Sequence, residues 1–197
     1  MTRVTADQAI SLDGFTAGPN QTREEPLGEG GEELHTWMFE AAEDHAAERA
    51  AILEASAFVM GRNMFAGPGE WDAAWRGWWG EEPPYHAPVF VLTHQERDDV
   101  PMDGGTTFHF VNSGIEEALG RARAAAGDGS ISIAGGAHTL RQYLAAGLVD
   151  ELRLHVAPVL LGAGERLFDG LTGVTFTPTA ARHHPLASHL TYRVDRA

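Results

Sequence analysis

The sequence predicts a three-layer α/β/α sandwich, an α/β fold built on a mainly parallel β-sheet with an antiparallel C-terminal edge. Up to Asp150, short apolar segments bounded by turn residues alternate with segments of helical periodicity. Beyond Asp150, only strand-like segments follow. Strands that are joined through helices pair in parallel with right-handed crossovers, and a terminal hairpin adds an antiparallel edge.

The N-terminal part begins with strand character over Arg3–Ile10 and continues into a turn-rich loop at Ser11–Asn20. The acidic, glycine-bearing segment Gln21–Glu33 indicates an exposed excursion. A long helix is predicted over Leu34–Ala55, because apolar residues recur there at helical spacing between charged ones. These apolar residues are Trp37, Ala41, Ala46, Ala50 and Leu53.

Three short apolar strands are predicted next, at Ala57–Met60, Val89–Thr93 and Thr107–Val111. A helical turn is expected at Arg62–Phe65, directly after the first of them. The long loop Gly67–Pro88 then contains four of the five tryptophans: Trp71, Trp75, Trp78 and Trp79. So many aromatic residues in one loop favour burial, with a substrate lid or a dimer contact as the alternatives.

A second helix is predicted over Ser113–Ala126, with Ser113 as its N-cap and Glu116 completing a capping box. The strand Ser130–Ala134 and the helix Ala137–Ala146 follow, joined by two glycines.

The remaining segments alternate or contain turn residues. Asp150–Val156 alternates cleanly, which predicts a strand with two different faces. Its apolar side has Leu152, Leu154 and Val156, and its polar side has Glu151, Arg153 and His155. After a turn at Gly162–Gly164, two closing strands are predicted near Val174–Ala181 and His189–Asp195.

Composition limits the function classes. The 197 residues show no internal repeat and no long linker, so we expect a single domain over residues 1–197. A formal charge of −14 repels phosphate backbones and anionic lipids, which argues against nucleic-acid and membrane partners. An anionic cofactor must therefore be held by local donors. The absence of cysteine excludes disulfides, thiolate catalysis and cysteine-ligated metals.

Location and metal content are expected from similar arguments. Met1–Ile10 has neither a basic region nor an apolar core of a signal peptide, and no stretch approaches the roughly 20 apolar residues that cross a bilayer. We therefore expect a cytoplasmic protein. The ten histidines include no HExxH pattern, and no metal site is expected.

The most informative segment for chemistry is the strand–glycine–glycine–helix unit around Gly135 and Gly136. Glycine lets the backbone approach a ligand closely, and the N-terminus of the following helix offers free N–H groups to a phosphate. A plain tight turn is the alternative. The unit does not have the GxGxxG spacing of a Rossmann site.

Two other predicted strands end in potential donors. Gly61, Arg62 and Asn63 follow the first, where a guanidinium suits a pyrophosphate or a 2′-phosphate. A surface arginine paired with a carboxylate is the alternative. Thr93 and His94 follow the next strand. Because ligands of open α/β sheets bind at the carboxyl ends of strands, the three segments together predict a binding site.

The order of five motifs resembles the dihydrofolate-reductase-like family. The motifs are SLDG (Ser11–Gly14), MGRNMF (Met60–Phe65), VFVLTH (Val89–His94), IAGGAHTL (Ile133–Leu140) and VDELRLHVAPVLLGAGERLF (Val149–Phe168). Within this family, the resemblance is to the branch that includes the C-terminal reductase domain of the bacterial riboflavin-biosynthesis deaminase–reductase. It covers nearly the whole chain.

The resemblance implies a dihydrofolate-reductase-like fold, NADPH as the cofactor and a homodimer. Gly61, Arg62 and Asn63 would lie along the phosphates of the cofactor, and Thr93 and His94 near its 2′-phosphate. Gly135 and Gly136 would form an unusual, often cis, peptide beside the nicotinamide. The helix N-terminus there would be presented by Ala137, His138, Thr139 and Leu140.

The resemblance also suggests substrate contacts. Asp13 would lie near the nicotinamide, as a catalytic and substrate-binding residue, although an Asx-type turn before Gly14 explains it equally well. Trp37 can stack on a flat ring or serve as a core aromatic. Dihydrofolate reductases also place a carboxylate in the first long helix. Glu40, Glu43 and Asp44 lie in that segment, but no motif assigns the role to any of them.

The sequence thus predicts an NADPH-dependent oxidoreductase, an enzyme that transfers a hydride to a small heteroaromatic substrate. Pterin-, pyrimidine- and flavin-like compounds are the leading classes. The cofactor performs the redox chemistry, while the protein orients the reactants and excludes water. The alternative is a non-catalytic protein that holds a nucleotide or a flavin in the same cleft.

Overall fold

A central β-sheet dominates the computed structural model, which describes residues 2–70 and 74–195. Its strands are β1 (Val4–Ser11), β3 (Ala57–Gly61), β4 (Pro88–Leu92), β5 (Val100–Pro101), β6 (Thr107–Val111), β7 (Ile131–Gly135), β8 (Glu151–Ala157), β10 (Thr175–His184) and β11 (Ala187–Asp195). Two short strands, β2 (Phe15–Ala17) and β9 (Glu165–Arg166), pair separately.

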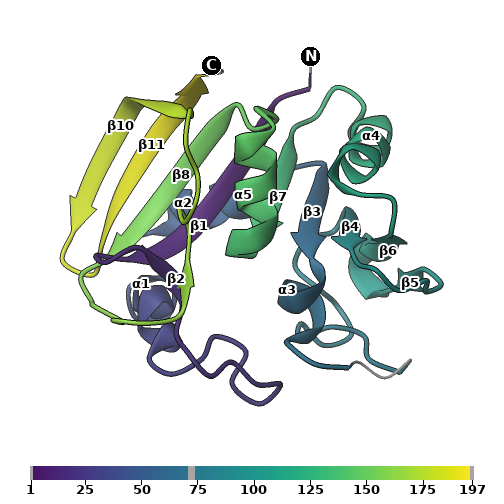
Figure 1. Cartoon of the computed structure of the whole chain (residues 1–197), viewed down its shortest axis with the longest axis horizontal. Coiled ribbons are helices and arrows are strands. Elements are labelled where there is room, and N and C mark those ends of the chain that lie inside the picture. The colour runs from purple at the N-terminus through teal and green to yellow at the C-terminus, as the bar shows by residue number, and fades with distance from the viewer. Residues whose placement is uncertain (1, 71–73, 196–197) are drawn as a thin grey trace.

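The strand order among the described residues is β10-β11-β8-β1-β7-β3-β4-β6-β5 (Figure 1). All neighbours from β8 to β6 are parallel, because helices or long loops connect them. β10 and β11 form an antiparallel hairpin beside β8, which confirms the mainly parallel sheet with an antiparallel C-terminal edge. The short strand β5 adds a second antiparallel edge that the sequence did not predict.

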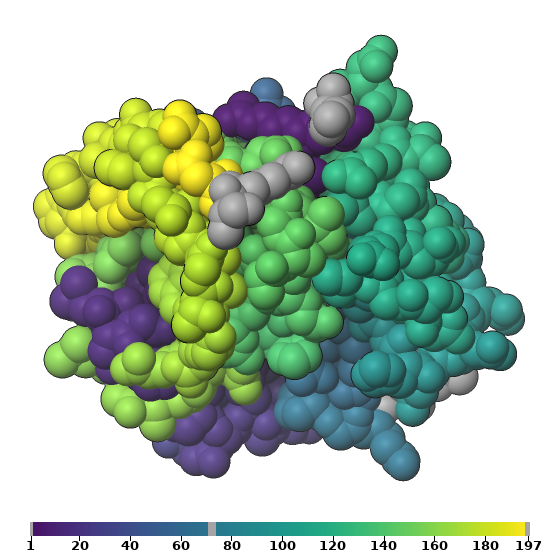
Figure 2. Space-filling view, turned by 45° about the horizontal axis from the view of Figure 1, so that its top comes forward, coloured from purple at the N-terminus to yellow at the C-terminus, as the bar shows by residue number. Residues whose placement is uncertain are grey.

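Helices cover both faces of the sheet, so the three-layer arrangement is confirmed. They are α1 (Thr36–Glu40), α2 (Ala46–Leu53), α3 (Arg62–Ala66), α4 (Ile115–Ala126) and α5 (Ala137–Ala145), with the 3-10 turns η1 (Gly31–His35) and η2 (Asp103–Gly105). In Figure 1, α5 lies in front of the sheet and α2 behind it. Figure 2 shows the green segment that includes α5 between the yellow C-terminal strands and the teal region of α4.

Two apolar cores lie on the two faces. One packs α4 and α5 against the sheet and includes Ala6, Ile133, Leu119 and Leu140. The other fills the space between α3, the tryptophan-bearing loop and the strands β3, β4 and β6. Within the described part of the chain, no helix is both long enough and apolar enough to cross a bilayer.

The predicted single helix over Leu34–Ala55 is wrong, because the chain breaks into η1, α1 and α2. The break is at residues 41–45, where Ala41 leaves the helical conformation and His45 turns into the protein, fully buried. Most of the apolar residues that suggested the helix are alanines, which gain little from burial. α2 accordingly has no buried residue, and the packing of His45 decides the local path instead.

The predicted capping box of the second helix is also wrong. α4 begins at Ile115 with Gly114 as its N-cap residue, and no side chain caps it. Ser113 instead directs its hydroxyl to the side chain of Asn112. Elsewhere the predicted strands and α5 are confirmed to within a few residues, as is the exposed excursion over Gln21–Glu33.

Candidate functional site

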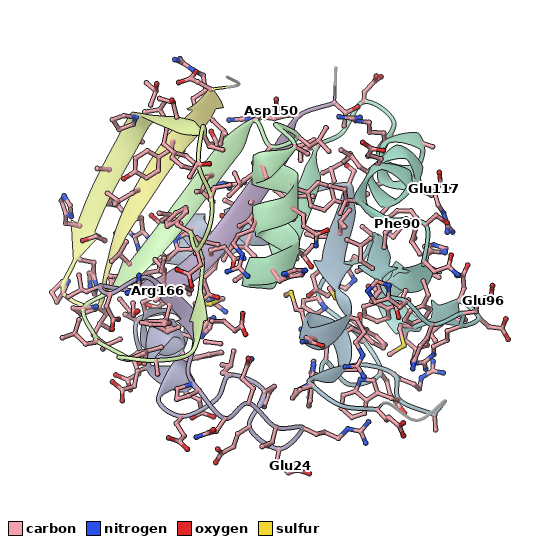
Figure 3. The ribbon with its side chains drawn as sticks, viewed as in Figure 1. Glu24, Phe90, Glu96, Glu117, Asp150 and Arg166 are labelled. Atoms are coloured by element: carbon pink, nitrogen blue, oxygen red, sulfur yellow. The ribbon has the colours of Figure 1, made fainter. Side chains whose placement is uncertain are left out.

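A large cleft lies at the carboxyl ends of the parallel strands. Its volume is about 1430 Å³, and it is lined by residues that follow β3, β4 and β7, together with residues of β1, α1 and β8. In Figure 3, side chains from α3 and from the region of Arg166 face the open space above the loop that carries Glu24. Glu24, Glu96 and Glu117 point outward, so these acidic side chains lie at the periphery.

Gly61 ends β3 and touches the beginning of α5. A Cβ atom added at Gly61 would lie 2.3 Å from Oγ1 of Thr139. Since real Cβ atoms do not approach that closely, the close packing of β3 against α5 requires glycine here. Both residues line the cleft.

Gly135 and Gly136 connect β7 to α5 through a cis peptide bond, as the resemblance implies. Gly135 has φ of 126°, a conformation that side chains with a Cβ rarely adopt. Gly136 is exposed, lines the cleft and directly precedes α5. The backbone N–H groups of the first turn of α5 lack partners within the helix, which makes them donors for an anionic ligand.

Four of the five predicted residues from Gly136 to Leu140 line the cleft: Gly136, Ala137, His138 and Thr139. Leu140 instead packs in the core, where its side chain is fully buried. Gly135 is also buried and contributes the backbone turn rather than a lining surface.

Arg62 and Asn63 line the cleft at the start of α3. The guanidinium of Arg62 donates to the side-chain oxygen of Asn63 at 3.1 Å, to the carbonyl oxygen of Gly67 at 2.8 Å and to that of Gly69. These bonds hold the positive charge at the edge of the cleft while fixing the loop that follows α3. Two of these three acceptors are backbone carbonyl groups of the loop that follows α3.

Thr93 and His94 line the opposite side, after β4. Thr93 is buried, and its hydroxyl accepts a hydrogen bond from the backbone N–H of Gln95 at 3.1 Å. His94 is exposed. The structure therefore brings all three predicted strand ends to one cleft, as the strand-end rule requires.

Asp13 does not lie among the described residues that line the cleft. Its carboxylate accepts hydrogen bonds from Ser11 Oγ at 2.6 Å and from the backbone N–H groups of Leu161 at 3.1 Å and Gly162 at 2.7 Å. The bond from Ser11 and the two backbone bonds lower the pKa of Asp13 to about 2. These contacts favour a structural role, tying the turn after β1 to the loop after β8.

Trp37 lines the cleft from α1 but is fully buried. Its ring lies against three histidines, with centroid distances of 4.7 Å to His155, 5.0 Å to His189 and 5.3 Å to His45. The ring is therefore a core aromatic that also borders the cleft, and its stacking on a substrate ring stays a prediction.

Three of the four tryptophans of the long loop, Trp75, Trp78 and Trp79, are half-buried. Trp75 Nε1 donates to the carbonyl oxygen of Phe65 at 2.8 Å, and Trp78 Nε1 donates to that of Met64 at 3.0 Å. Trp78 and Trp79 line the cleft, and Trp79 also stacks on Phe108. Burial against α3 and β6 is the main role of these three rings, whereas Trp71 lies outside the described residues.

The sequence reasoning missed a polar group at the back of the cleft. Asp7 on β1 pairs in register with Arg153 on β8, and Ala9 pairs with His155 two residues further on. Residues paired or two apart share a face, so the side chains of Asp7, Arg153 and His155 meet. Oδ1 of Asp7 lies 3.2 Å from Arg153 Nε and 3.5 Å from His155 Nε2.

Asp7 and His155 line the cleft, and both are more than nine-tenths buried. Within the described part of the chain, no hydrogen bond reaches the carboxylate oxygens of Asp7, His155 Nε2 or Trp37 Nε1. Buried polar atoms normally form hydrogen bonds, so buried polar atoms beside a cleft that form none indicate a ligand site. An acidic residue within the predicted strand Arg3–Ile10 was the signal in the sequence.

Behind this group, His45, Glu48 and His189 lie close enough to resemble a metal site. Arg182 fills the space between them, since its guanidinium donates to both carboxylate oxygens of Glu48, at 2.6 and 2.7 Å, and lies 2.9 Å from His45 Nδ1. A cation that already occupies these lone pairs argues against a metal ion there.

Several solved structures have a fold similar to that of this chain. A protein from Shewanella sp. PV-4 that is named for riboflavin biosynthesis is 23% identical, with a TM-score of 0.65 and coverage of 99% of this chain and 100% of that chain. A pyrimidine reductase-like protein from Corynebacterium diphtheriae is 15% identical, with a TM-score of 0.59 and coverage of 100% and 93%. No curated protein sequence is significantly similar.

A third similar structure is a deaminase/reductase from Thermotoga maritima, named for diaminohydroxyphosphoribosylaminopyrimidine deamination and 5-amino-6-(5-phosphoribosylamino)uracil reduction. It is 16% identical, with a TM-score of 0.62, and the match covers 98% of this chain but 56% of that one. These likenesses confirm the dihydrofolate-reductase-like fold. The chain also matches the RibD C-terminal domain family over residues 2–191, and it therefore belongs to that family.

Proposed function

We propose that this chain is an NADPH-dependent reductase that transfers a hydride to a small heteroaromatic substrate. The observation that carries the proposal is the composition of the cleft. One part offers the glycine-bordered start of α5, the guanidinium of Arg62 and the imidazole of His138, which suits an anionic cofactor. The other part offers Asp7, Trp37 and His155, which suits a polar ring.

The cleft is large enough for a cofactor and a substrate together. Its volume of about 1430 Å³ exceeds that of most pockets for a single drug-sized molecule, roughly 300–1,000 Å³. The tight approach of Gly61 to Thr139 supports a cofactor that lies along the backbone. Gly61, Arg62, Asn63, Thr93, His94 and the segment from Gly135 to Thr139 would hold NADPH, which supplies the hydride when bound.

A pyrimidine-like ring is the leading substrate class. The carboxylate oxygens of Asp7 can accept hydrogen bonds from a ligand, and the indole N–H of Trp37 can donate one. Together they match a ring edge that carries both N–H and carbonyl groups. The names of two structures with the same fold also refer to pyrimidine reduction. Pterin- and flavin-like rings contain such an edge too and are the comparison substrates.

Titration with NADPH is expected to quench protein fluorescence saturably, with a dissociation constant below about 100 μM. Adding a pyrimidine, pterin or flavin candidate should then cause oxidation of NADPH, measured as loss of nicotinamide absorbance. The absence of saturable binding would refute the cofactor assignment. Tight binding of a nucleotide or flavin without turnover of any candidate would instead establish the non-catalytic binder.

We further propose that residues 1–197 act as a single reductase domain in the cytoplasm, where NADPH is available, and form a homodimer. Exposed apolar side chains support self-association, because Leu12 and Leu160 lie on adjacent loops and are 63% and 72% exposed. Light scattering is expected to give about twice the 21.2 kDa mass of one chain. A mass of one chain at micromolar concentration would exclude the dimer.

A further inference from the structure

Four histidines form a continuous chain that begins at the cleft. Nδ1 of His155 lies 2.7 Å from Nδ1 of His189, and Nε2 of His189 lies 2.8 Å from Nδ1 of His45. Nε2 of His45 then lies 3.1 Å from Nδ1 of His184. The last ring reaches Asp44, at 3.6 Å, on the surface of the protein. Each inner ring thus uses both of its nitrogen atoms.

Two groups outside the chain fix which nitrogen carries each proton. Arg182 can only donate, and its guanidinium lies 2.9 Å from His45 Nδ1, so this nitrogen is an acceptor. The backbone N–H of Leu186 donates to His184 Nδ1 at 3.3 Å, so this nitrogen is an acceptor too. Neutral His45 and His184 therefore carry their protons on Nε2.

The proton positions of His189 and His155 follow from that of His45. His45 Nδ1 accepts, so the facing Nε2 of His189 donates. A neutral imidazole has one donor and one acceptor, so Nδ1 of His189 accepts. The nitrogen that faces it, Nδ1 of His155, must then donate. Only Nε2 of His155 is left to gain or lose a proton.

The position of that nitrogen suits proton donation. Nε2 of His155 lies 3.5 Å from Oδ1 of Asp7, an oxygen that only accepts when ionised, so the contact is attractive when Nε2 carries a proton. His155 and Asp7 line the cleft and also a second cavity of about 250 Å³ on the side of β11. Asp7 and His155 therefore lie between the ligand site and the other three histidines of the chain.

We propose that His155 is the proton donor of the reaction, acting through Nε2, and that His189, His45 and His184 are positioning residues that keep the other proton of His155 on Nδ1. This assignment rests on the proposed reductase function. It goes beyond that function by identifying the acid and the residues that orient it.

The step balances in atoms and charge. When bound, NADPH would supply a hydride, with two electrons, to a ring carbon of the substrate and would be released as NADP⁺. A ring nitrogen or oxygen of the substrate takes the proton from His155 Nε2, which forms a new N–H or O–H bond. His155 becomes neutral with its proton on Nδ1. A proton from water then restores Nε2 after the product leaves.

The electrostatic setting supports this arrangement. Burial, together with the neighbouring His155, lowers the pKa of His189 to about 4, and burial also lowers the pKa of His45. Both rings are therefore neutral at physiological pH, as the tautomer argument requires. Among the described residues, the titratable or charged groups around His155 are Asp7 on β1, Arg153 on β8, His35 on η1 and His189 on β11.

Replacing His155 by glutamine is expected to lower kcat about 100-fold, because the proton donor is lost. Replacing His189 by glutamine should lower kcat on the order of tenfold, because His155 is then free to carry its proton on either nitrogen. The matched control is His183→Gln, since His183 neighbours His184 but is exposed outside the chain, bonded to Ser188. It should leave kcat and its pH profile unchanged.

A test that needs no turnover uses long-range ¹H–¹⁵N spectra, which distinguish the two histidine tautomers. In the wild-type protein, His45, His184 and His189 should carry protons on Nε2, and His155 on Nδ1. A deprotonated Nδ1 on His155 would overturn the positioning role, whatever the kinetics show. Retention of wild-type kcat and pH profile by His155→Gln would overturn the donor role. Unchanged NADPH affinity in each variant confirms that the cofactor site is folded.

Different experimental results would refute the reductase function and the donor role of His155. If the wild-type protein binds NADPH but reduces no candidate heterocycle, the reductase function fails, and the donor role of His155 fails with it. If the wild-type protein turns over and only the histidine variants or the spectra disagree, the reductase function stands and the inference about His155 is refuted.

Discussion

Replacing Gly61 by valine is expected to weaken NADPH binding by about 100-fold or more, which corresponds to roughly 2.7 kcal/mol. A Cβ atom at this position would lie 2.3 Å from Thr139 Oγ1, and valine adds two methyl groups beyond Cβ, so we expect the start of α5 to be pushed away from β3. Displacement of α5 would shift the backbone donors of its first turn away from the cofactor. Fluorescence titration with NADPH measures the loss.

The matched control is Gly120→Ala on the exposed side of α4. A Cβ atom there meets no atom within 4 Å, and alanine is a better helix former, so NADPH affinity should be unchanged and stability equal or higher by up to about 1 kcal/mol. Circular dichroism and thermal unfolding establish that Gly61→Val remains folded. Wild-type NADPH affinity in folded Gly61→Val would exclude the cofactor from this part of the cleft.

Replacing Asp7 by asparagine is expected to lower kcat/KM for the heterocyclic substrate by about 100-fold or more, with NADPH affinity changed less than about twofold. The substitution removes the negative charge beside His155 Nε2 and removes the nearer of two carboxylates paired with Arg153, since Asp7 lies at 3.2 Å and Glu151 at 3.5 Å. It also removes an acceptor for the ring edge of the substrate. Steady-state kinetics and NADPH titration separate the two effects.

Asp13→Asn is the comparison variant, because it tests whether the carboxylate predicted from the sequence takes part in catalysis. Its turnover is expected to stay within about threefold of the wild type. Its stability should fall at neutral pH, since the native pKa of Asp13 is about 2, below the ordinary value of 3.8 for an aspartate. A carboxyl group with a lowered native pKa contributes stability above about pH 4 and loses it as the pH falls through 2.

The stability difference between wild type and Asp13→Asn should therefore shrink in acid, as urea unfolding at several pH values can measure. If Asp13→Asn instead lost turnover while Asp7→Asn kept it, the roles that the geometry favours would have to be exchanged.

The residues proposed to bind the cofactor could be predicted from the sequence, because each group of them lies directly after a strand. Each part is a buried strand followed by residues with a special backbone or a donor, as at Gly61–Asn63 and at Gly135–Gly136. Parallel strands bring such ends to one edge whatever the details of packing. The position of these residues followed from the strand assignments alone.

The proposed proton donor, His155, could not be predicted in the same way. Its role depends on which face of the sheet is covered. The alternation of β8 correctly separates Leu154 from His155, but it does not show that the polar face is covered too. η1 and α1 lie over that face, which makes His155 almost fully buried. His45 joins it only because the predicted long helix breaks there, a tertiary effect that helical spacing does not reveal.

The hairpin formed by β10 and β11 has a consequence for how this protein can diversify. The hairpin supplies Arg182, His184 and His189, whereas the residues proposed to hold NADPH all lie between Gly61 and Thr139. In these two proposals, the residues that would hold the hydride donor and those that would orient the proton donor lie in separate stretches of the chain. Substitutions in the hairpin are expected to change the pH optimum of the enzyme while preserving its cofactor preference, so the two properties can evolve, or be engineered, independently.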